Sequence, residues 1–273
     1  MVRQCVKLFA VIVLFYLPAP THAQTGCFAA NSAFKSGESV TYKIYYHWTF
    51  LWLESGEVKF NVALKDYYNI PCYYLTGFGS TYKKYDWFYK VRDTFQTYLD
   101  TATFASMRFT RITNEGGTHV NNDNVFDNKR HKIFCFSVDK KNKFHEDTVR
   151  TQPCTFDVLT AVYYTRCFNF SGYKHNDTIP LNLYLDGKIY NIHLRYMGKE
   201  TVTSSLGKFN CIKFKVSLIK GTIFKAGEEM TVRVTDDKNR LPIYIEAPII
   251  IGSVKVELQS FSNLRNPMDA KVK

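Results

Sequence analysis

Carboxylates are the first groups in this sequence whose type could support catalysis. Two facing carboxylates can act as acid and base in glycoside hydrolysis, and Asp93 and Asp157 are the two that could serve. Asp157 precedes a helical pattern, where aspartate is a favoured N-cap. Asp236 and Asp237 lie between two apolar runs, where a hairpin turn accounts for both. Because turns and caps explain these residues, a carboxylate-based hydrolase is the least favoured function.

Motifs for metal binding or nucleophilic catalysis are missing from the sequence. His145 and Glu146 begin like a zinc-protease helix, but Val149 stands where the second histidine belongs. The chain has no serine elbow, no phosphate-binding glycine loop and no Cys-x-x-Cys pair. We therefore expect no catalytic residue, no metal and no cofactor, and a protein that is not an enzyme.

An aromatic connection joins two alternating runs at a point where polar turn residues are expected. It extends from His47 to Leu53 and contains Trp48, Phe50 and Trp52. These side chains either plug one end of the fold, or rim a cavity or contact a partner or lipid surface, as exposed apolar patches usually do. Trp48 continues a series that faces inward, whereas Trp52 lies past the expected turn and is the better candidate for exposure.

Tyr163 and Arg166 are the next candidates for ligand or partner binding. Within residues 157–167, they follow Leu159 and Val162 at the spacing of one helix face, so the segment predicts a short helix. An arginine beside aromatic rings can hold an anionic headgroup or a carboxylate through two hydrogen bonds. A surface salt bridge is the alternative role for Arg166.

Cysteine usage adds a second question about cross-links. Of the seven cysteines, Cys5 falls in the leader described below, and an even set of six remains. Six cysteines in an exported protein permit up to three disulfides, with buried free thiols as the alternative. The possible disulfide cysteines are Cys27, Cys72, Cys135, Cys154, Cys167 and Cys211.

The elements that must position these residues are mostly strands. Apolar and polar residues alternate in runs such as 40–48, 58–64 and 212–218, and Asp186-Gly187 joins two further runs as a tight hairpin. An aromatic content of 16% also favours strands, whereas residues 114–156 are polar and give no clear pattern. A long antiparallel meander with one apolar face must stack or curl. We expect an all-β, mainly antiparallel fold, curled into an incomplete or closed β-barrel with the one short helix.

The first 23 residues predict a cleaved signal peptide. Two basic residues precede the apolar run 8–17, which is too short to span a bilayer, and Ala23 fits the cleavage site. Lipidation at Cys27 is the alternative, but the preceding residues do not fit a lipobox. We expect residues 24–273 to form a single exported domain with no transmembrane span, because no linker or repeat divides them.

The mature chain is basic. Without the leader it keeps 34 Lys and Arg against 24 Asp and Glu, a net charge of +10. This excess suits anionic lipid headgroups, an acidic glycan or an acidic envelope protein, with simple solubility as the alternative. An exported protein has no access to cytoplasmic nucleic acid. The densest clusters, 129–132 and 140–143, lie beside turn residues and are expected to be solvated hairpin ends.

Several segments resemble a known family in their order along the chain. They are Phe34–Gly56, Val91–Thr94, Asp157–Arg166, Gly207–Cys211, Thr235–Asp237, Leu241–Ile243 and Gly252–Val254. Together they resemble domain of unknown function 3108, an exported family of Gram-negative bacteria. The resemblance covers nearly all of the mature chain and implies an incomplete antiparallel β-barrel in the periplasm or cell envelope. It implies no activity, because none is established for the family.

Three functions follow, in order of preference. The first is a periplasmic, non-enzymatic protein that binds an apolar or amphipathic envelope molecule, such as a lipid or lipid-linked glycan, since barrel mouths are frequent ligand sites. The second is an accessory protein of envelope polysaccharide export or assembly, whose basic, tyrosine-rich surface engages an acidic glycan or an envelope protein. The third is the carboxylate-based hydrolase.

Overall fold

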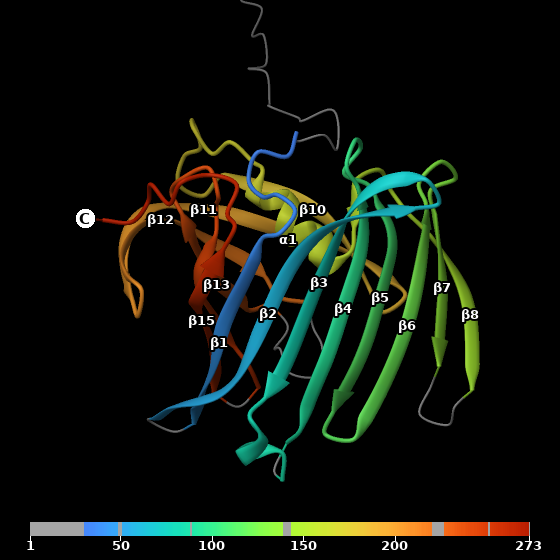
Figure 1. Ribbon diagram of the computed structural model, residues 1–273, viewed down its shortest axis with the longest axis horizontal. Coiled ribbons are helices and arrows are strands. Elements are labelled where there is room, and N and C mark those ends of the chain that lie inside the picture. Colours follow the sequence, from blue (N-terminus) through green and yellow to red (C-terminus); the bar gives the residue numbers. More distant parts are fainter. Residues whose placement is uncertain are drawn as a thin grey trace, which may run out of the picture.

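A computed structural model describes residues 30–48, 51–87, 89–138, 143–219, 227–250 and 252–272. The signal peptide, Cys27 and Phe50 of the sequence predictions lie outside these residues, as does the side chain of Trp48. The described part of the chain forms one continuous sheet of fifteen strands, with a short α-helix inside its curl (Figure 1).

The bounds of the strands and helices are β1 (Ser39–Trp48), β2 (Leu51–Tyr67), β3 (Ile70–Thr81), the 3-10 helix η1 (Lys83–Tyr85), β4 (Val91–Asp100), β5 (Ser106–Glu115), β6 (Thr118–Asp127), β7 (Lys132–Val138), β8 (Phe144–Arg150), β9 (Thr155–Phe156), α1 (Val158–Arg166), β10 (Thr178–Leu185), β11 (Lys188–Ser204), β12 (Gly207–Ser217), β13 (Glu229–Thr235), β14 (Pro242–Pro248) and β15 (Ser253–Ser262). Consecutive strands form hairpins from β1 to β8 and again from β10 to β15, and β9 and helix α1 lie between these two series.

The strand order places β1 and β15, the first and last of the described strands, side by side in the middle of the sheet. The order is β8-β7-β6-β5-β4-β3-β2-β1-β15-β14-β13-β12-β11-β10-β9, and every pair is antiparallel except β9 with β10. The free edges, β8 and β9, are not paired with each other, so the barrel is incomplete. The prediction of an all-β, curled antiparallel sheet is confirmed, in its incomplete rather than its closed form.

Alternation along each strand decides which face turns inward. In β12, Ile212 and Phe214 are buried against the interior, whereas Lys213 between them lies on the outer face and pairs with Glu200. The predicted Asp186-Gly187 hairpin is confirmed, since both residues have positive φ (50° and 73°) and join β10 to β11.

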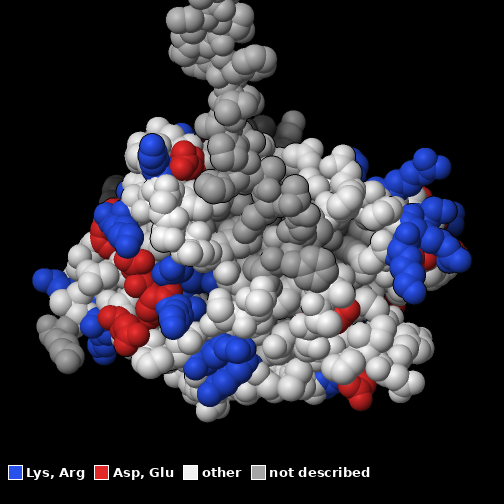
Figure 2. Space-filling model, turned by 90° about the horizontal axis from the view of Figure 1, so that it is seen from above, with Lys and Arg blue, Asp and Glu red and all other residues white. Residues whose placement is uncertain are grey.

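The two ends of the strands differ. Helix α1 lies inside the curl at what we call the helix end, with the β2–β3, β4–β5 and β6–β7 turns; the opposite end, with the β1–β2, β3–β4, β5–β6 and β14–β15 connections, is the loop end (Figure 1). Figure 2 views the helix end and shows lysines and arginines gathered at its margin. The β6–β7 turn there carries exposed Lys129 and Arg130, as expected of a solvated hairpin end.

Contacts across the interior hold the curl together. Tyr184 of β10 packs into a small core with Phe109, Phe126 and Ile133 from β5, β6 and β7, and its hydroxyl donates to the buried Asn124 side chain. None of the helices in the described residues is long and apolar enough to cross a membrane.

Candidate ligand cavities beneath helix α1

The N-terminus of α1 is fixed by a fully buried aspartate. One Asp157 carboxylate oxygen accepts hydrogen bonds from the backbone amides of Leu159 and Thr160, at 2.9 and 3.0 Å, as the N-cap prediction requires. The hydroxyls of Thr97 on β4 and Ser106 on β5 donate to the same carboxylate, at 2.8 and 2.6 Å. Asp157 therefore ties the start of the helix to the sheet.

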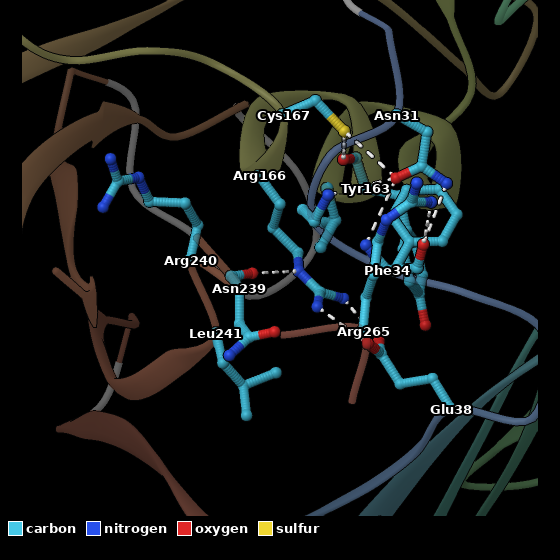
Figure 3. A network of polar contacts seen from close by, with 12 residues as sticks. Asn31, Phe34, Glu38, Tyr163, Arg166, Cys167, Asn239, Arg240, Leu241 and Arg265 are labelled. Atoms are coloured by element: carbon cyan, nitrogen blue, oxygen red, sulfur yellow. Dashed lines mark hydrogen bonds and ion pairs between the residues drawn. The ribbon is translucent and has the colours of Figure 1, made fainter. Parts of the chain in front are cut away.

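The C-terminus of α1 is fixed by a buried ion pair (Figure 3). Arg166 donates from Nη1 and Nη2 to the two carboxylate oxygens of Glu38, at 2.6 and 3.0 Å, and from Nε to the Asn239 carbonyl at 3.0 Å. Glu38 has no exposed surface and Arg166 only 5%. The pair thus joins the helix to the segment before β1 and to the β13–β14 turn.

Aromatic rings surround this ion pair. The Arg166 guanidinium lies 5.7 Å from the Phe34 ring centre and 5.1 Å from that of Tyr163. Burial raises the pKa of both Tyr163 and Tyr42 far above the usual range, although the positive charge of Arg166 acts in the opposite direction. Both phenols are therefore neutral at physiological pH.

Two apolar cavities lie beneath α1, one on each side of this arginine. Cavity 1, about 270 Å³, lies between the helix and strands β10–β14, with walls that include Leu181, Phe214 and Val232. Cavity 2, about 260 Å³, lies between the helix and strands β1, β2, β14 and β15, with walls that include Tyr42 and Phe60. Neither cavity is sealed from solvent.

The two cavities adjoin at residues that line both. These are Val162, Arg166, Pro242 and Ile245. Val162 is 45% exposed, although its neighbours Ala161 and Tyr163 on the helix are buried. An exposed valine on a helix enclosed by a sheet therefore faces the hollow interior rather than packed core.

Arg240 supplies a polar group to cavity 1. Its Nη1 lies 3.3 Å from Asp236, and its guanidinium lies 5.6 Å from the Phe170 ring centre. Its buried Nε has no hydrogen-bond partner among the described residues. This atom is a donor that a bound molecule could satisfy.

The residues that the sequence singled out fall in two places. Tyr163 and Arg166 lie together at cavity 2. Trp52, 39% exposed, lies instead at the loop end. Its ring packs at a tilt against that of His47, with the ring centres 4.7 Å apart, and lies 5.3 Å from Lys255 Nζ. Trp52 does not line either cavity.

Sequence reasoning missed Glu38, Asn239 and Arg240 as parts of this site. Glu38 follows a Lys-Ser-Gly turn and Asn239 and Arg240 belong to a polar hairpin turn, so each has the local pattern of a solvated residue. Nothing near them in the sequence indicates that α1 covers them. The adjacent Asp237 has the predicted turn role, because it accepts hydrogen bonds from the Asn239 and Arg240 amides.

The disulfide prediction is wrong for four of the six cysteines, because Cys72, Cys135, Cys167 and Cys211 are free thiols. Cys72, Cys135 and Cys211 lie on β3, β7 and β12, which are not neighbours in the sheet. Burial raises the pKa of Cys72 to about 11 and that of Cys211 to about 12, so both stay protonated. The structure therefore favours the alternative of free thiols at these positions, buried at Cys72 and Cys211 and half-buried at Cys135 and Cys167.

The two carboxylates considered for hydrolysis have separate surroundings. Asp157 is enclosed by the hydroxyls and amides described above. Asp93 of β4 lies beside Glu115 of β5, and burial, together with the Glu115 charge, raises the pKa of Asp93 to about 6. Its carboxylate also accepts a hydrogen bond from the Asn114 amide at 3.3 Å.

Comparisons with known proteins agree with this architecture. The family model described as "Protein of unknown function (DUF3108)" matches residues 41–259. A crystal structure of a "Beta-barrel-like Protein of Domain of Unknown Function DUF1849" from Brucella abortus is similar, with a TM-score of 0.56 and 10% identity over 84% of this chain and 99% of that one. At that identity the likeness concerns the fold alone. The sequence matches no curated protein.

Proposed function

The chain belongs to the DUF3108 family, and we propose that it is an exported, non-enzymatic protein that binds an apolar or amphipathic small molecule inside its curled sheet. The observation that carries the proposal is the pair of adjoining apolar cavities beneath α1. Their volumes together fall within the range of about 300–1,000 Å³ that is typical of small-molecule sites. Apolar walls with few polar groups are also typical of such sites.

The charges near the cavities favour a particular kind of molecule. Arg166 is neutralised by Glu38 through two hydrogen bonds, so it offers no free charge to cavity 2. Arg240, which lines cavity 1, keeps a buried Nε with no hydrogen-bond partner among the described residues. We therefore expect the apolar body of the ligand to cross Val162 between the cavities, and an oxygen acceptor of the ligand to meet Arg240.

Export and the absence of catalysis rest on the sequence and on the roles of the acidic residues. The leader pattern of the first 23 residues supports export, and the resemblance described above implies the periplasm or envelope of a Gram-negative bacterium as the destination. The carboxylates that anchor α1, Asp157 and Glu38, accept hydrogen bonds from groups that hold the helix in place. A sheltering role needs no reactive group.

Blocking the junction of the cavities tests this proposal. A Val162→Trp substitution adds a large ring at the point that both cavities share, and Val162 is exposed enough that the core need not rearrange. We expect it to weaken binding of the fluorescent fatty acid parinaric acid at least about tenfold, the effect of roughly 1.4 kcal/mol. The matched control is Ile112→Trp, at a residue 49% exposed that lines neither cavity.

The result separates a binding site from loose packing. If wild type and both variants bind parinaric acid equally, the cavities are not its site. Native mass spectrometry of wild-type protein purified from its own envelope supplies an independent readout, in which a ligand-free protein under gentle conditions contradicts the proposal.

A second candidate, an accessory role with envelope polysaccharide, is favoured by one observation. Tyr67, Tyr74 and Tyr98 form a row of ring contacts, at 4.9 Å and 4.8 Å, and Lys65 Nζ lies 3.7 Å over Tyr74. Aromatic faces beside a cation suit a sugar ring with an acidic group. Pull-down with an acidic glycan tests it: binding that falls with salt and with Tyr74→Ala supports this role, and no binding at low salt excludes it.

A further inference from the structure

Exposed apolar side chains gather on the turns of the loop end, opposite α1. Trp87 is 84% exposed, Leu51 61%, Ile250 53%, Tyr89 47% and Trp52 39%. They come from the β3–β4 connection, the start of β2 and the β14–β15 connection. We call these five residues the apolar rim.

Contacts between backbone segments place the connections that carry the apolar rim next to one another. A Cβ on Gly252 would lie 2.2 Å from the His47 carbonyl oxygen, so the β14–β15 turn lies directly against the β1–β2 hairpin. The Tyr82 amide donates to the Ser55 carbonyl of β2 at 3.0 Å, which places the β3–β4 connection on the other side of that hairpin. The β14–β15, β1–β2 and β3–β4 connections thus lie side by side along the loop end.

Positive charge accompanies the rim. Lys83, Lys84 and Lys90 are exposed in the same β3–β4 connection as Trp87 and Tyr89. The acidic residue of that connection, Asp86, is paired with Arg92 at 2.7 Å and does not offset the lysines. An anionic surface would therefore be attracted to the connection that carries the highly exposed ring of Trp87.

We propose that the loop end docks on the surface of an anionic lipid bilayer, with the apolar rim inserted at the level of the headgroups. Tryptophan and tyrosine prefer this level, because their rings are apolar while their polar atoms stay hydrated. The neighbouring lysines are attracted to anionic lipid headgroups. Exposed apolar side chains from three neighbouring connections, with exposed lysines beside them, suit insertion among anionic headgroups.

Docking in this orientation brings the cavities toward the bilayer. Ile44 and Val256 of cavity 2 and Met230 of cavity 1 lie in the loop-end halves of their strands. The docking surface does not depend on the cavities, however, and the two proposals can fail separately.

Vesicle flotation tests the docking surface. The probes are vesicles of phosphatidylcholine with and without phosphatidylglycerol. We expect flotation only with phosphatidylglycerol, about tenfold or more weaker binding for K83E/K84E, and a several-fold loss for Trp87→Ser. Bromine on the lipid chains should also quench tryptophan fluorescence in wild-type protein.

Matched controls lie at the helix end. Tyr68 is 85% exposed on the β2–β3 turn, and Lys129 and Arg130 are exposed on the β6–β7 turn. Tyr68→Ser and K129E/R130E should float like wild type, and so should Val162→Trp, which separates docking from ligand binding. Equal losses for rim and control variants, or no flotation with phosphatidylglycerol, would overturn the proposal. Because all of these variants change exposed side chains, we expect each of them to fold. A melting temperature equal to that of wild type checks this.

Discussion

Arg166 and Glu38 bring opposite charges together from positions 128 residues apart, at a site where both side chains are buried. Removing each ion from water costs several kcal/mol, and the two hydrogen bonds between them offset that cost only while both partners are present. The pair therefore adds little net stability. Its main role is to fix the position at which the end of α1 meets the segment before β1.

Removing one partner of this ion pair should lower the free energy of unfolding far more than replacing both partners by apolar residues. We expect Glu38→Gln to lower the free energy of unfolding by about 3–5 kcal/mol, because it leaves the buried Arg166 charge without its partner. The double variant E38L/R166M should recover most of that loss, because no charge remains buried. Urea denaturation measures both, with Lys43→Met, at an exposed ion pair with Glu54, as a control that changes little. A double variant as unstable as Glu38→Gln contradicts this account.

The raised pKa of Asp93, about 6, makes a pH-dependent contribution. The folded state binds the Asp93 proton more tightly than the unfolded chain does, so stability falls as pH rises from about 4 to about 6. We expect Asp93→Asn to stabilise the protein by about 1–2 kcal/mol at pH 8, a value reduced for solvent screening, and to have little effect at pH 4.

Urea denaturation at the two pH values measures this difference. Asp123→Asn is the matched control, because Asp123 is paired with Arg108 at 2.6 Å and its loss should destabilise at pH 8. If Asp93→Asn leaves the free energy of unfolding unchanged at both pH values, then burial beside Glu115 does not raise the pKa of Asp93.

At the scale of elements, α1 depends on polar anchors at both ends rather than on its own length. A helix of nine residues is marginal alone in water. Asp157→Ala removes the acceptor for two helix amides and for the hydroxyls of Thr97 and Ser106. We expect a loss of about 3–5 kcal/mol from the cap and the unsatisfied hydroxyls.

Hydrogen exchange locates this effect. Amides of α1 should exchange faster in Asp157→Ala, while those of β1 and β15 in the middle of the sheet keep their protection relative to global unfolding. Thr165→Ala, at a hydroxyl that bonds only within the helix, serves as the control. Protection of α1 that equals wild type in both variants contradicts the anchoring role.

The elements also show which features the sequence could predict. Strands such as β12 and the Asp157 cap follow from patterns a few residues long, and both are confirmed. Residues 114–156 gave no pattern, although β6, β7 and β8 lie there, because the inward positions of β6 include Asn122 and Asn124 instead of apolar residues. Asn124 is only 3% exposed and bonds to Tyr184, a residue whose position could not be known from local sequence. Glu38 could not be predicted as the partner of Arg166 for the same reason.

At the scale of the whole molecule, the edge strand β8 is much more exposed to solvent than the strands in the centre of the sheet. Six of the seven β8 residues are exposed, and only Val149 is half-buried. Strands with solvent on both faces open locally at low free energy. We expect β8 amides to exchange much faster than those of β1 and β15, measured by native-state hydrogen exchange. Uniform protection across the sheet would contradict this gradient.

The pairing of β1 with β15 has a consequence for the order in which the chain can fold. Every other antiparallel pair joins neighbours along the chain, but Ser39 meets Ser262 only after nearly all the intervening sequence exists. Closing so long a loop is slow, and partly made chains leave the edge of β1 unpaired. Linking residue 272 to residue 30 and opening the chain between β8 and β9 would make every strand the sequential neighbour of its partner. The described strands thus form a simple meander that is interrupted at its centre, and the pairing of β15 with β1 unites its two halves.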